Sequence, residues 1–403
     1  MSVGLSAPEN LLPIKGIKLA ACHSGIKKDS TSDDLVLIEL EEGSTVASVF
    51  TTNKFCAAPV IVAKQHIDST VAIRHLLINS GNANAGTGNE GLQNSVKTCA
   101  AVAAETGFSE QSVLPFSTGV IGAQLPADKI VSAIPDLLKH LNEDNWLAAA
   151  NGIMTTDTLP KAVSRQLVIN NKTINITGIC KGSGMIKPDM ATMLAYVATD
   201  ASISQVELEN CLKQVVNTSF NSITVDGDTS TNDACLLIAT GANGQVVDGS
   251  SVEFMTALNE VFSHLAQSII RDGEGATKFI EIQVEQAATS QDARELAYTI
   301  AHSPLVKTAL FASDANWGRI LAAVGRAPVS ELEIDKVDLY LGDVCLIKNG
   351  LPDSAYTEQN GHDVMQQQDI LIRVNLNLGA QSAIIWTTDL SYNYVKINAE
   401  YRS

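Results

Sequence analysis

Short β-branched segments alternate with amphipathic helical stretches along the whole chain, and this alternation constrains the fold more than any other feature. Residues 251–271 place large apolar side chains on one helical stripe, and Ser204 with Glu207 has the spacing of a capping box for another helix. We therefore expect a mixed α/β protein. Short β-branched runs predict strands at 60–64, 73–79, 166–170 and 173–179.

The C-terminal part of the chain has a different pattern from the part before it. Residues 370–378 alternate between apolar and polar side chains, which predicts a half-buried antiparallel strand. Helical patterns dominate the region that precedes it, and no internal repeat or low-complexity linker is visible. We therefore place a domain boundary near residue 280, between a larger domain of about 1–280 and a smaller one of about 281–403.

The composition excludes several classes of protein. Of the 403 residues, 45% are apolar and 18% are charged, as in an ordinary soluble globular protein. The formal net charge of −17 argues against a nucleic-acid or anionic-membrane partner, and the 5% aromatic content disfavours base stacking. Seven scattered cysteines without a CxxC pair are typical of a reducing compartment. Because we see neither a signal-peptide pattern nor an apolar run of ~18–20 residues, we expect a cytoplasmic protein.

Residues 181–200, KGSGMIKPDMATMLAYVATD, carry the most specific chemical signal. Thr192 stands where a glycine-broken loop becomes an apolar run. A threonine in that setting can attack the peptide bond before it and become an N-terminal nucleophile. Its α-amino group, with a reference pKa near ~8, then serves as general base for its own hydroxyl. Most Met-Ala-Thr triplets are ordinary strand or core sequence, so the local spacing alone leaves both interpretations open.

Two glycine-containing segments are also candidates for function. Residues 86–91, GTGNEG, match the GxGxxG pattern of dinucleotide-binding turns, but 80–85 separate them from the preceding strand and no acidic residue is suitably placed. A loop that shapes a pocket is therefore favoured. Residues 117–122, STGVIG, follow an apolar run and offer the backbone N–H groups that an oxyanion hole requires, although such a segment is more often a β-turn.

These segments, with several others, resemble the ornithine acetyltransferase (glutamate N-acetyltransferase, ArgJ) family over essentially the whole chain. The cleavage segment of that family has the form KGSGMI…P.MATML, as residues 181–194 have here. The other matches are STGVIG at 117–122, TTDT.PK at 155–161, DGEGATK at 272–278, Ser219 to Asn232, Asn316-Trp-Gly-Arg319, Asn79 to Asn84, and the C-terminal YVKINAEYRS at 394–403.

The resemblance implies a role for each matching residue. It makes Thr192 the nucleophile, released by cleavage between Ala191 and Thr192, and it makes Thr118 and Gly119 the oxyanion hole. Lysine suits the α-carboxylate that every relevant substrate carries. The family often ends in threonine, so a C-terminal serine keeps the hydroxyl and loses the methyl group. The implied substrate-binding residues are Thr155, Lys181, Thr192, Glu274, Asn398 and Ser403.

The resemblance also implies a fold, a reaction and an assembly. The expected fold is a layered α-β-β-α sandwich of the N-terminal-nucleophile type with a smaller C-terminal α/β domain. Residues 1–191 become an α chain and 192–403 a β chain, which associate as α2β2. The enzyme moves the acetyl group of N2-acetylornithine to glutamate. No separate cofactor and no metal are implied, and acetyl-CoA as a second donor separates bifunctional from monofunctional members.

Two other functions remain as alternatives at this point. A related aminopeptidase or amidohydrolase of the N-terminal-nucleophile type would share self-cleavage but pass its acyl group to water. A nucleotide-binding module built on residues 86–91 would need no cleavage at all. Acetyl transfer, release of free acetate and the intact mass of the chain separate the three.

Overall fold

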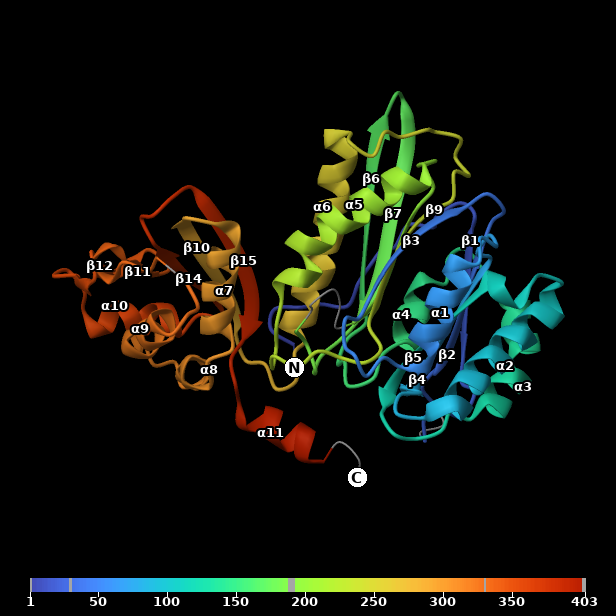
Figure 1. The fold of residues 1–403 in the computed structure, drawn as a ribbon, viewed down its shortest axis with the longest axis horizontal. Coiled ribbons are helices and arrows are strands. Elements are labelled where there is room, and N and C mark those ends of the chain that lie inside the picture. The colour runs from blue at the N-terminus through green and yellow to red at the C-terminus, as the bar shows by residue number, and fades with distance from the viewer. Residues whose placement is uncertain (1, 29–30, 188–192, 330, 401–403) are drawn as a thin grey trace. The chain divides into compact units, whose positions relative to one another are not determined.

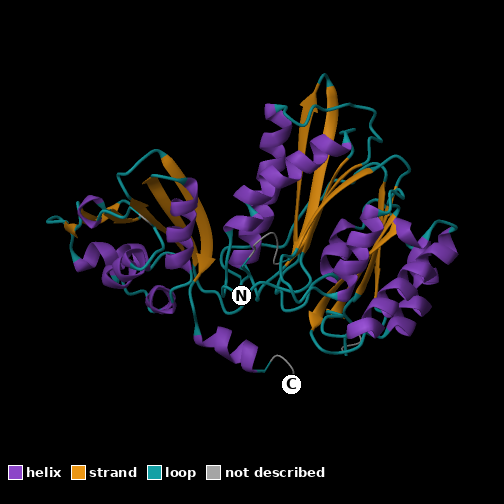
Figure 2. Cartoon of the chain, in the orientation of Figure 1, coloured by secondary structure: helices purple, strands orange, loops and turns teal. Residues whose placement is uncertain are grey.

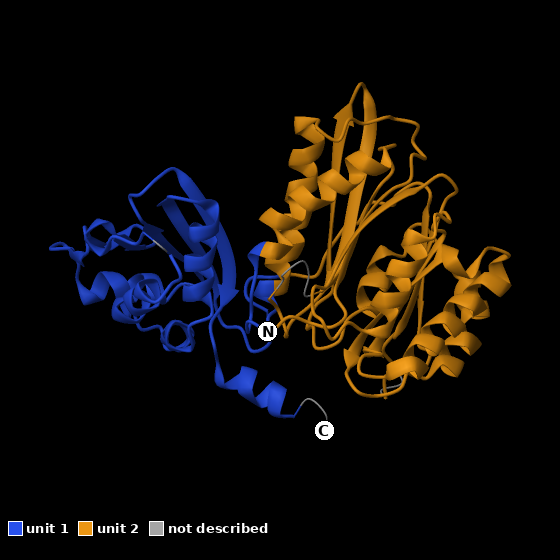
Figure 3. Ribbon diagram, viewed as in Figure 1, with its two compact units in different colours: residues 1–5, 222–227, 270–403 blue, residues 6–221, 228–269 orange. Residues whose placement is uncertain are grey.

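The computed structural model describes residues 2–28, 31–187, 193–329 and 331–400. The described chain forms two compact units (Figures 1 and 3). Unit 1 contains residues 1–5, 222–227 and 270–403, and unit 2 contains residues 6–221 and 228–269. The polypeptide therefore crosses between the units several times, and the segment 222–227 belongs to the unit that is otherwise C-terminal.

Unit 2 contains two sheets, and the first has four strands in the order β1-β2-β4-β5. Its pairs are antiparallel except for β4 and β5, which are parallel. A parallel pair needs a long crossover, which the helix α2 (Gly88–Thr106) supplies. The strands are β1 (Ile17–Cys22), β2 (Leu35–Leu40), β4 (His75–Asn82) and β5 (Val113–Val120).

The second sheet of unit 2 has five strands in the order β3-β9-β8-β7-β6. Only β8 and β9 are parallel, and α5 (Gln205–Thr218) lies between them in the sequence. The predicted strands at 166–170 and 173–179 are confirmed within the long hairpin β6–β7. The strands are β3 (Thr45–Phe50), β6 (Lys161–Ile169), β7 (Lys172–Lys181), β8 (Leu194–Thr199) and β9 (Ala234–Ala239).

The two sheets of unit 2 face each other across an apolar core. Phe116 of β5 and Tyr196 of β8 meet edge to face there, with ring centroids 5.4 Å apart. Helices α2 and α3 (Ala127–Lys139) pack on the outer face of the first sheet. Helices α5 and α6 (Val252–Arg271) cover the second sheet, where α6 presses Leu265 against Gly178 of β7 (Figures 1 and 2). The predicted helix-sheet-sheet-helix sandwich is confirmed.

Two shorter helices complete this core, and one of them corrects a prediction. Residues 60–64 were expected to form a strand, but they lie in helix α1 (Ala58–Asp68). Pro59 occupies the first turn of α1, where a missing N–H costs nothing, and the helix packs along β5. Tertiary packing therefore outweighs the β-branched run at 60–62. The second helix, α4 (Trp146–Gly152), buries Trp146 in the same core.

The predicted helix starts in unit 2 are present. Ser204 and Glu207 form both hydrogen bonds of the capping box at the start of α5. The helix expected at 251–271 is α6, and its apolar stripe is fully buried. Short 3-10 helices lie at η1 (Glu110–Ser112) and η2 (Phe220–Ser222).

Unit 1 is built on a six-stranded sheet in the order β13-β12-β11-β14-β10-β15. Helix α7 (Ser290–Ala301) packs on β10 and β15 (Figure 1). The strands are β10 (Phe279–Ala287), β11 (Asp338–Leu341), β12 (Val344–Lys348), β13 (Leu351–Pro352), β14 (Asp369–Asn375) and β15 (Gln381–Thr388). The other helical elements are α8 (Pro304–Phe311), α9 (Trp317–Gly325), η3 (Ile334–Lys336), α10 (Glu358–Met365) and α11 (Tyr392–Ala399).

The alternating segment predicted at 370–378 corresponds to β14, whose alternate side chains are buried as expected. Its pairing is mixed, however, because β14 runs antiparallel to β11 and parallel to β10. The helices between β10 and β14 provide the long connection that a parallel neighbour requires. An alternating pattern reports which face is buried and carries no information on the direction of the neighbouring strand.

Candidate active site

The ends of β5 and β7 in unit 2 carry the predicted oxyanion-hole residues and one predicted substrate residue. Thr118 and Gly119 lie near the end of β5, opposite Ser80 and Gly81 of β4. Lys181 is the last residue of β7 and pairs with Leu194, the first residue of β8. Residue 193 therefore lies beside the end of β7, one position after the predicted nucleophile.

Buried amides join the strand ends of the two sheets. The side chain of Asn232 donates hydrogen bonds to the carbonyl oxygens of Ser117, at 2.9 Å, and Ala83. Two residues further on, the backbone N–H of Ala234 donates to the carbonyl oxygen of Met193 at 3.0 Å. A continuous chain of bonds therefore links the residue before Thr118 to the residue after Thr192.

The backbone at Gly119 is shaped by a close approach of two strands. Gly119 has a φ of 132°, which L side chains rarely adopt. A Cβ atom added there would lie 2.3 Å from the carbonyl carbon of Gly81 and 2.6 Å from the backbone nitrogen of Asn82. Only glycine fits at this position. The turn interpretation of residues 117–122 is therefore replaced by a strand end packed tightly against its neighbour.

Asp157 ties two predicted substrate-binding segments together. One of its carboxylate oxygens, Oδ2, accepts a hydrogen bond from the backbone N–H of Thr155 at 3.0 Å. The other, Oδ1, accepts from the backbone N–H of Gly182 at 2.8 Å and from the Lys161 ammonium at 2.6 Å. The Asp157 and Lys161 side chains are both completely buried. The position of Thr155 and the backbone next to Lys181 therefore depend on one ion pair.

Burial and neighbouring charges set the protonation of the carboxyl groups at this site. Burial alone would raise the pKa of Asp157, but the positive charges of Lys161 and Lys181 outweigh it and hold that pKa well below its usual range. Asp233 shows the opposite balance, because burial raises its pKa well above the usual range despite the attraction of Lys181. The lysines therefore favour the carboxylate form of Asp157, whereas burial disfavours the charged form of Asp233.

The predicted substrate residues of unit 1 contact each other. The side-chain amide of Asn398, in α11, donates a hydrogen bond to Glu274 Oε2 at 2.8 Å. Glu274 is only 7% exposed, so it is a buried acid although it follows the end of α6. The N-terminus of α11 is fixed by Ser391, whose hydroxyl donates to the carbonyl oxygen of Gly275 at 2.6 Å. The described part of the C-terminal tail is thus docked on the 272–278 segment.

Three predicted site residues lie outside the described residues: Ala191, Thr192 and Ser403. For the nucleophile, the structure provides the position of its neighbour Met193 and of the strand β8 that follows. For the C-terminus, it provides the helix α11 and the side chain of Asn398.

Comparison with known proteins decides the family. The ArgJ family model matches residues 18–403 of this chain. The arginine biosynthesis bifunctional protein ArgJ of Pseudomonas fluorescens is 52% identical over 412 residues, which cover all of both chains. The protein of the same name from Methylococcus capsulatus is 53% identical over 397 residues, 98% of this chain and 97% of its own. The chain belongs to the ArgJ family.

Membership confirms the predicted activity class of this ArgJ-family chain, an acetyltransferase of arginine biosynthesis, over the hydrolase alternative. Among solved structures, the ArgJ protein of Bacillus halodurans is 40% identical and covers 50% of this chain and 96% of its own, with a TM-score of 0.48. An ornithine acetyltransferase from Mycobacterium tuberculosis, crystallised with ornithine, is 32% identical over 45% of this chain and 93% of its own, with a TM-score of 0.38.

The GTGNEG segment has a structural role in this ArgJ-family fold. It joins β4 to α2, and the Asn84 side chain fills the turn by donating to the Gly91 carbonyl oxygen and to Ser95 Oγ, each at 2.9 Å. A Cβ at Gly91 would overlap the side chains of Thr87 and Asn84. The start of α2 is therefore packed with the chain's own side chains.

Other features of the described residues bear on the class of site. All seven cysteines are free thiols. Within the part of the chain that the structure describes, no group of three or more His, Cys, Asp and Glu side chains is arranged to hold a metal ion. No helix in the described ranges has both the length and the apolar character needed to cross a membrane.

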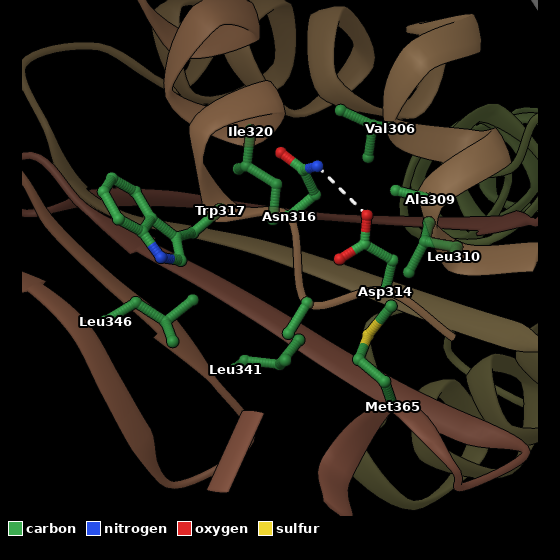
Figure 4. A pocket seen from close by; sticks show the side chains of 11 residues that line it. Val306, Ala309, Leu310, Asp314, Asn316, Trp317, Ile320, Leu341, Leu346 and Met365 are labelled. Atoms are coloured by element: carbon green, nitrogen blue, oxygen red, sulfur yellow. Dashed lines mark hydrogen bonds between the residues drawn. The ribbon is translucent and has the colours of Figure 1, made fainter. Parts of the chain in front are cut away.

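A small pocket in unit 1 has none of the described site residues in its lining. It encloses about 280 Å³, including its open mouth, and is lined mainly by aliphatic side chains of α8, α9 and the sheet (Figure 4). At its rim, Asn316 Nδ2 donates to Asp314 Oδ2 at 3.0 Å, and Trp317 lies beside Leu346 (Figure 4). The matching segment Asn316-Trp-Gly-Arg319 thus serves the packing of α9 in unit 1.

Sequence reasoning missed the residues that support the site. It did not select Asp157, Lys161, Asn232 or Asp233. Three of these stand inside quoted motifs, Asp157 and Lys161 in TTDT.PK and Asn232 at the end of the segment from Ser219, so the motifs themselves contained the signal. A charged pair four residues apart in a loop looks like solvated sequence until burial shows otherwise.

Proposed function

We propose that this chain transfers the acetyl group of N2-acetylornithine to glutamate, giving ornithine and N-acetylglutamate, through an acetyl ester on Thr192. The observation that carries the proposal is the convergence of strand ends in unit 2. Thr118 and Gly119, Lys181 and the residue after Thr192 are joined by strand pairing and by the Asn232 bonds. Membership of the ArgJ family supports the same conclusion.

The first proposed step makes the nucleophile. The Thr192 hydroxyl attacks the carbonyl carbon of Ala191, the peptide C–N bond breaks, and the Thr192 nitrogen takes the proton to become a free amine. Water then hydrolyses the resulting ester. Residues 1–191 and 192–403 remain associated, because β7 from the first fragment pairs with β8 from the second.

The second stage transfers the acetyl group. The Thr192 α-amine takes the proton from the hydroxyl, whose oxygen attacks the acetyl carbonyl of N2-acetylornithine. Negative charge develops on that carbonyl oxygen, which the groups at Thr118 and Gly119 stabilise. The amide C–N bond breaks and ornithine leaves with the proton. The amine of glutamate then attacks the acetyl ester and restores the hydroxyl, so the kinetics are ping-pong.

Donor and acceptor share an α-carboxylate but carry side chains of opposite charge. A pocket matched to one sign would repel the other. We assign the shared α-carboxylate to Lys181, whose ammonium is positive and whose residue is 9% exposed. The variable side-chain end falls to Glu274, Asn398 and Ser403, with Thr155 as a further substrate contact.

Several finer features complete the proposal. We propose that the cleaved chains assemble as α2β2, that the enzyme works in the cytoplasm, and that it needs no separate cofactor. Acetyl-CoA is the second donor to be tested, because the relatives are named bifunctional proteins.

The test is a donor assay on the purified, cleaved protein with glutamate as acceptor. The proposal requires N-acetylglutamate to form from N2-acetylornithine, with parallel lines in double-reciprocal plots. Free acetate released at the same rate with or without glutamate would instead identify a hydrolase. Replacing N2-acetylornithine with acetyl-CoA in the same assay distinguishes a bifunctional enzyme from a monofunctional one.

A further inference from the structure

The buried Asp157–Lys161 ion pair lies next to the lysine that we assign to the substrate. The Lys161 ammonium lies 2.6 Å from Asp157 Oδ1, and neither side chain is exposed to solvent. Lys161 begins β6 opposite Cys180, and Lys181 is the next residue along β7. The positive charge of Lys181 acts on the same carboxylate. Two lysines therefore compete for a single buried carboxylate.

Lys161 holds that carboxylate, and Lys181 does not. Within the described ranges, no carboxylate lies within ion-pair distance of the Lys181 ammonium. Lys181 also acts on a second acid, Asp233, which is buried. One Asp233 oxygen, Oδ2, accepts no hydrogen bond from the described residues, and burial disfavours the charged form of this side chain.

Among the described side chains of this cluster, one carboxylate, Asp157, therefore faces two lysines, Lys161 and Lys181. Burial disfavours the charged form of the other acid, Asp233. An uncompensated charge at a buried position is costly unless an anion joins it. A site of this kind selects a ligand with one carboxylate, which both the donor and the acceptor of the proposed reaction provide.

We propose that Lys161 is a positioning residue: by occupying Asp157, it keeps Lys181 available for the α-carboxylate of the substrate. The inference rests on the proposed function and assigns a residue to the selection of that carboxylate. A second effect follows from the same contacts, because Asp157 also holds the backbone at Thr155 and Gly182. Removing the Lys161 charge would let Asp157 capture Lys181 within the site.

The test uses two acetyl donors that differ only in the α-carboxylate: N2-acetylornithine and N-acetylputrescine. In Lys161→Gln, which can still donate a hydrogen bond to Asp157, we expect the preference in kcat/KM for N2-acetylornithine to fall by about tenfold or more, as for the loss of a charge-assisted hydrogen bond. The fall should appear in KM. The matched control is Lys172→Gln, at the exposed opposite end of β7, where Nζ donates a hydrogen bond to the Gly244 carbonyl oxygen at 3.2 Å. This variant should keep the preference.

The double variant Asp157→Asn/Lys161→Gln removes both charges and leaves Lys181 without a competitor, so the preference should return. If the ion pair were only structural, kcat/KM would fall equally for both donors in Lys161→Gln, and the double variant would not regain the preference. Either result would overturn the inference. If intact mass shows that Lys161→Gln is not cleaved, the double variant alone tests the inference. A preference for N2-acetylornithine like that of the wild type supports it, and loss of that preference overturns it. A wild-type protein that transfers no acetyl group from N2-acetylornithine would refute the proposed function itself.

Discussion

Replacing Gly119 by alanine tests whether the strand end that we propose as the oxyanion hole is held by backbone contact. The added Cβ would lie 2.3 Å from the Gly81 carbonyl carbon and 2.6 Å from the Asn82 nitrogen, both backbone atoms that a rotamer change cannot move. Gly122, three residues later, provides a matched control. It also has a positive φ, 86°, but a Cβ there would meet nothing within 4 Å.

The two substitutions share one cost and differ in another. Each places an L side chain at positive φ, which costs about 1–2 kcal/mol. Only Gly119→Ala adds a steric clash, worth about 1–3 kcal/mol when packed structure has to shift. We therefore expect Gly119→Ala to lower the free energy of unfolding by about 2–5 kcal/mol and Gly122→Ala by about 1–2 kcal/mol.

The effect on catalysis should separate the variants further. A displaced Thr118–Gly119 backbone no longer presents its groups where the oxyanion develops, and losing one such donor costs about 10²–10³ in kcat. Urea unfolding midpoints and kcat for acetyl transfer, measured on both variants, check the two expectations. Equal stability and equal kcat in Gly119→Ala and Gly122→Ala would refute the reasoning that this strand contact builds the oxyanion hole.

Two further predictions concern unit 1. Asn398→Asp places a second carboxylate beside Glu274, so the rate of the half-reaction with ornithine should rise relative to that with glutamate. The two half-reactions are measured separately, and an equal loss of rate in both would contradict the assigned roles. Burial lowers the pKa of Lys307 to about 8, although Asp389 and Asp226 oppose the shift. Between pH ~8 and ~10.4 the unfolded chain therefore binds more protons than the native one. The free energy of unfolding should therefore rise with pH across that window by up to about 3 kcal/mol relative to Lys307→Met. Chemical denaturation of both proteins at a series of pH values measures this difference, and parallel pH profiles for the two would contradict the expectation.

The sequence predicted the elements whose signals are local. The capping box of α5 and the apolar stripe of α6 depend on residues within one helix, and both are present. The β-branched runs at 166–170 and 173–179 also predicted strands from local sequence, and the structure pairs them as β6 and β7. Residues 60–64 failed because a β-branched run has the same composition in a strand and in a buried helix, and only the packing of α1 along β5 decides between them.

The same distinction between local signals and long-range contacts holds for the candidate site. The predicted positions of Thr118, Gly119 and Lys181 came from motifs, and the structure shows how strand pairing collects them. The Asn232 bonds could not be predicted, because they join segments 115 residues apart in the sequence. The charge state of Asp157 depends on burial and on two lysines from different strands, which no local spacing encodes.

The central claim is that Thr192 becomes the acetyl-carrying nucleophile, and mass spectrometry tests it most directly. The protein is incubated with N2-acetylornithine in the absence of glutamate, and the intact masses of its fragments are measured. The account predicts two fragments, residues 1–191 and 192–403, with one acetyl group gained by the second and lost again when glutamate is added. Thr192→Ala should remain a single uncut chain without an acetyl group. An uncut wild-type chain that still transfers acetyl groups, or an acetyl group on the first fragment, would contradict the account.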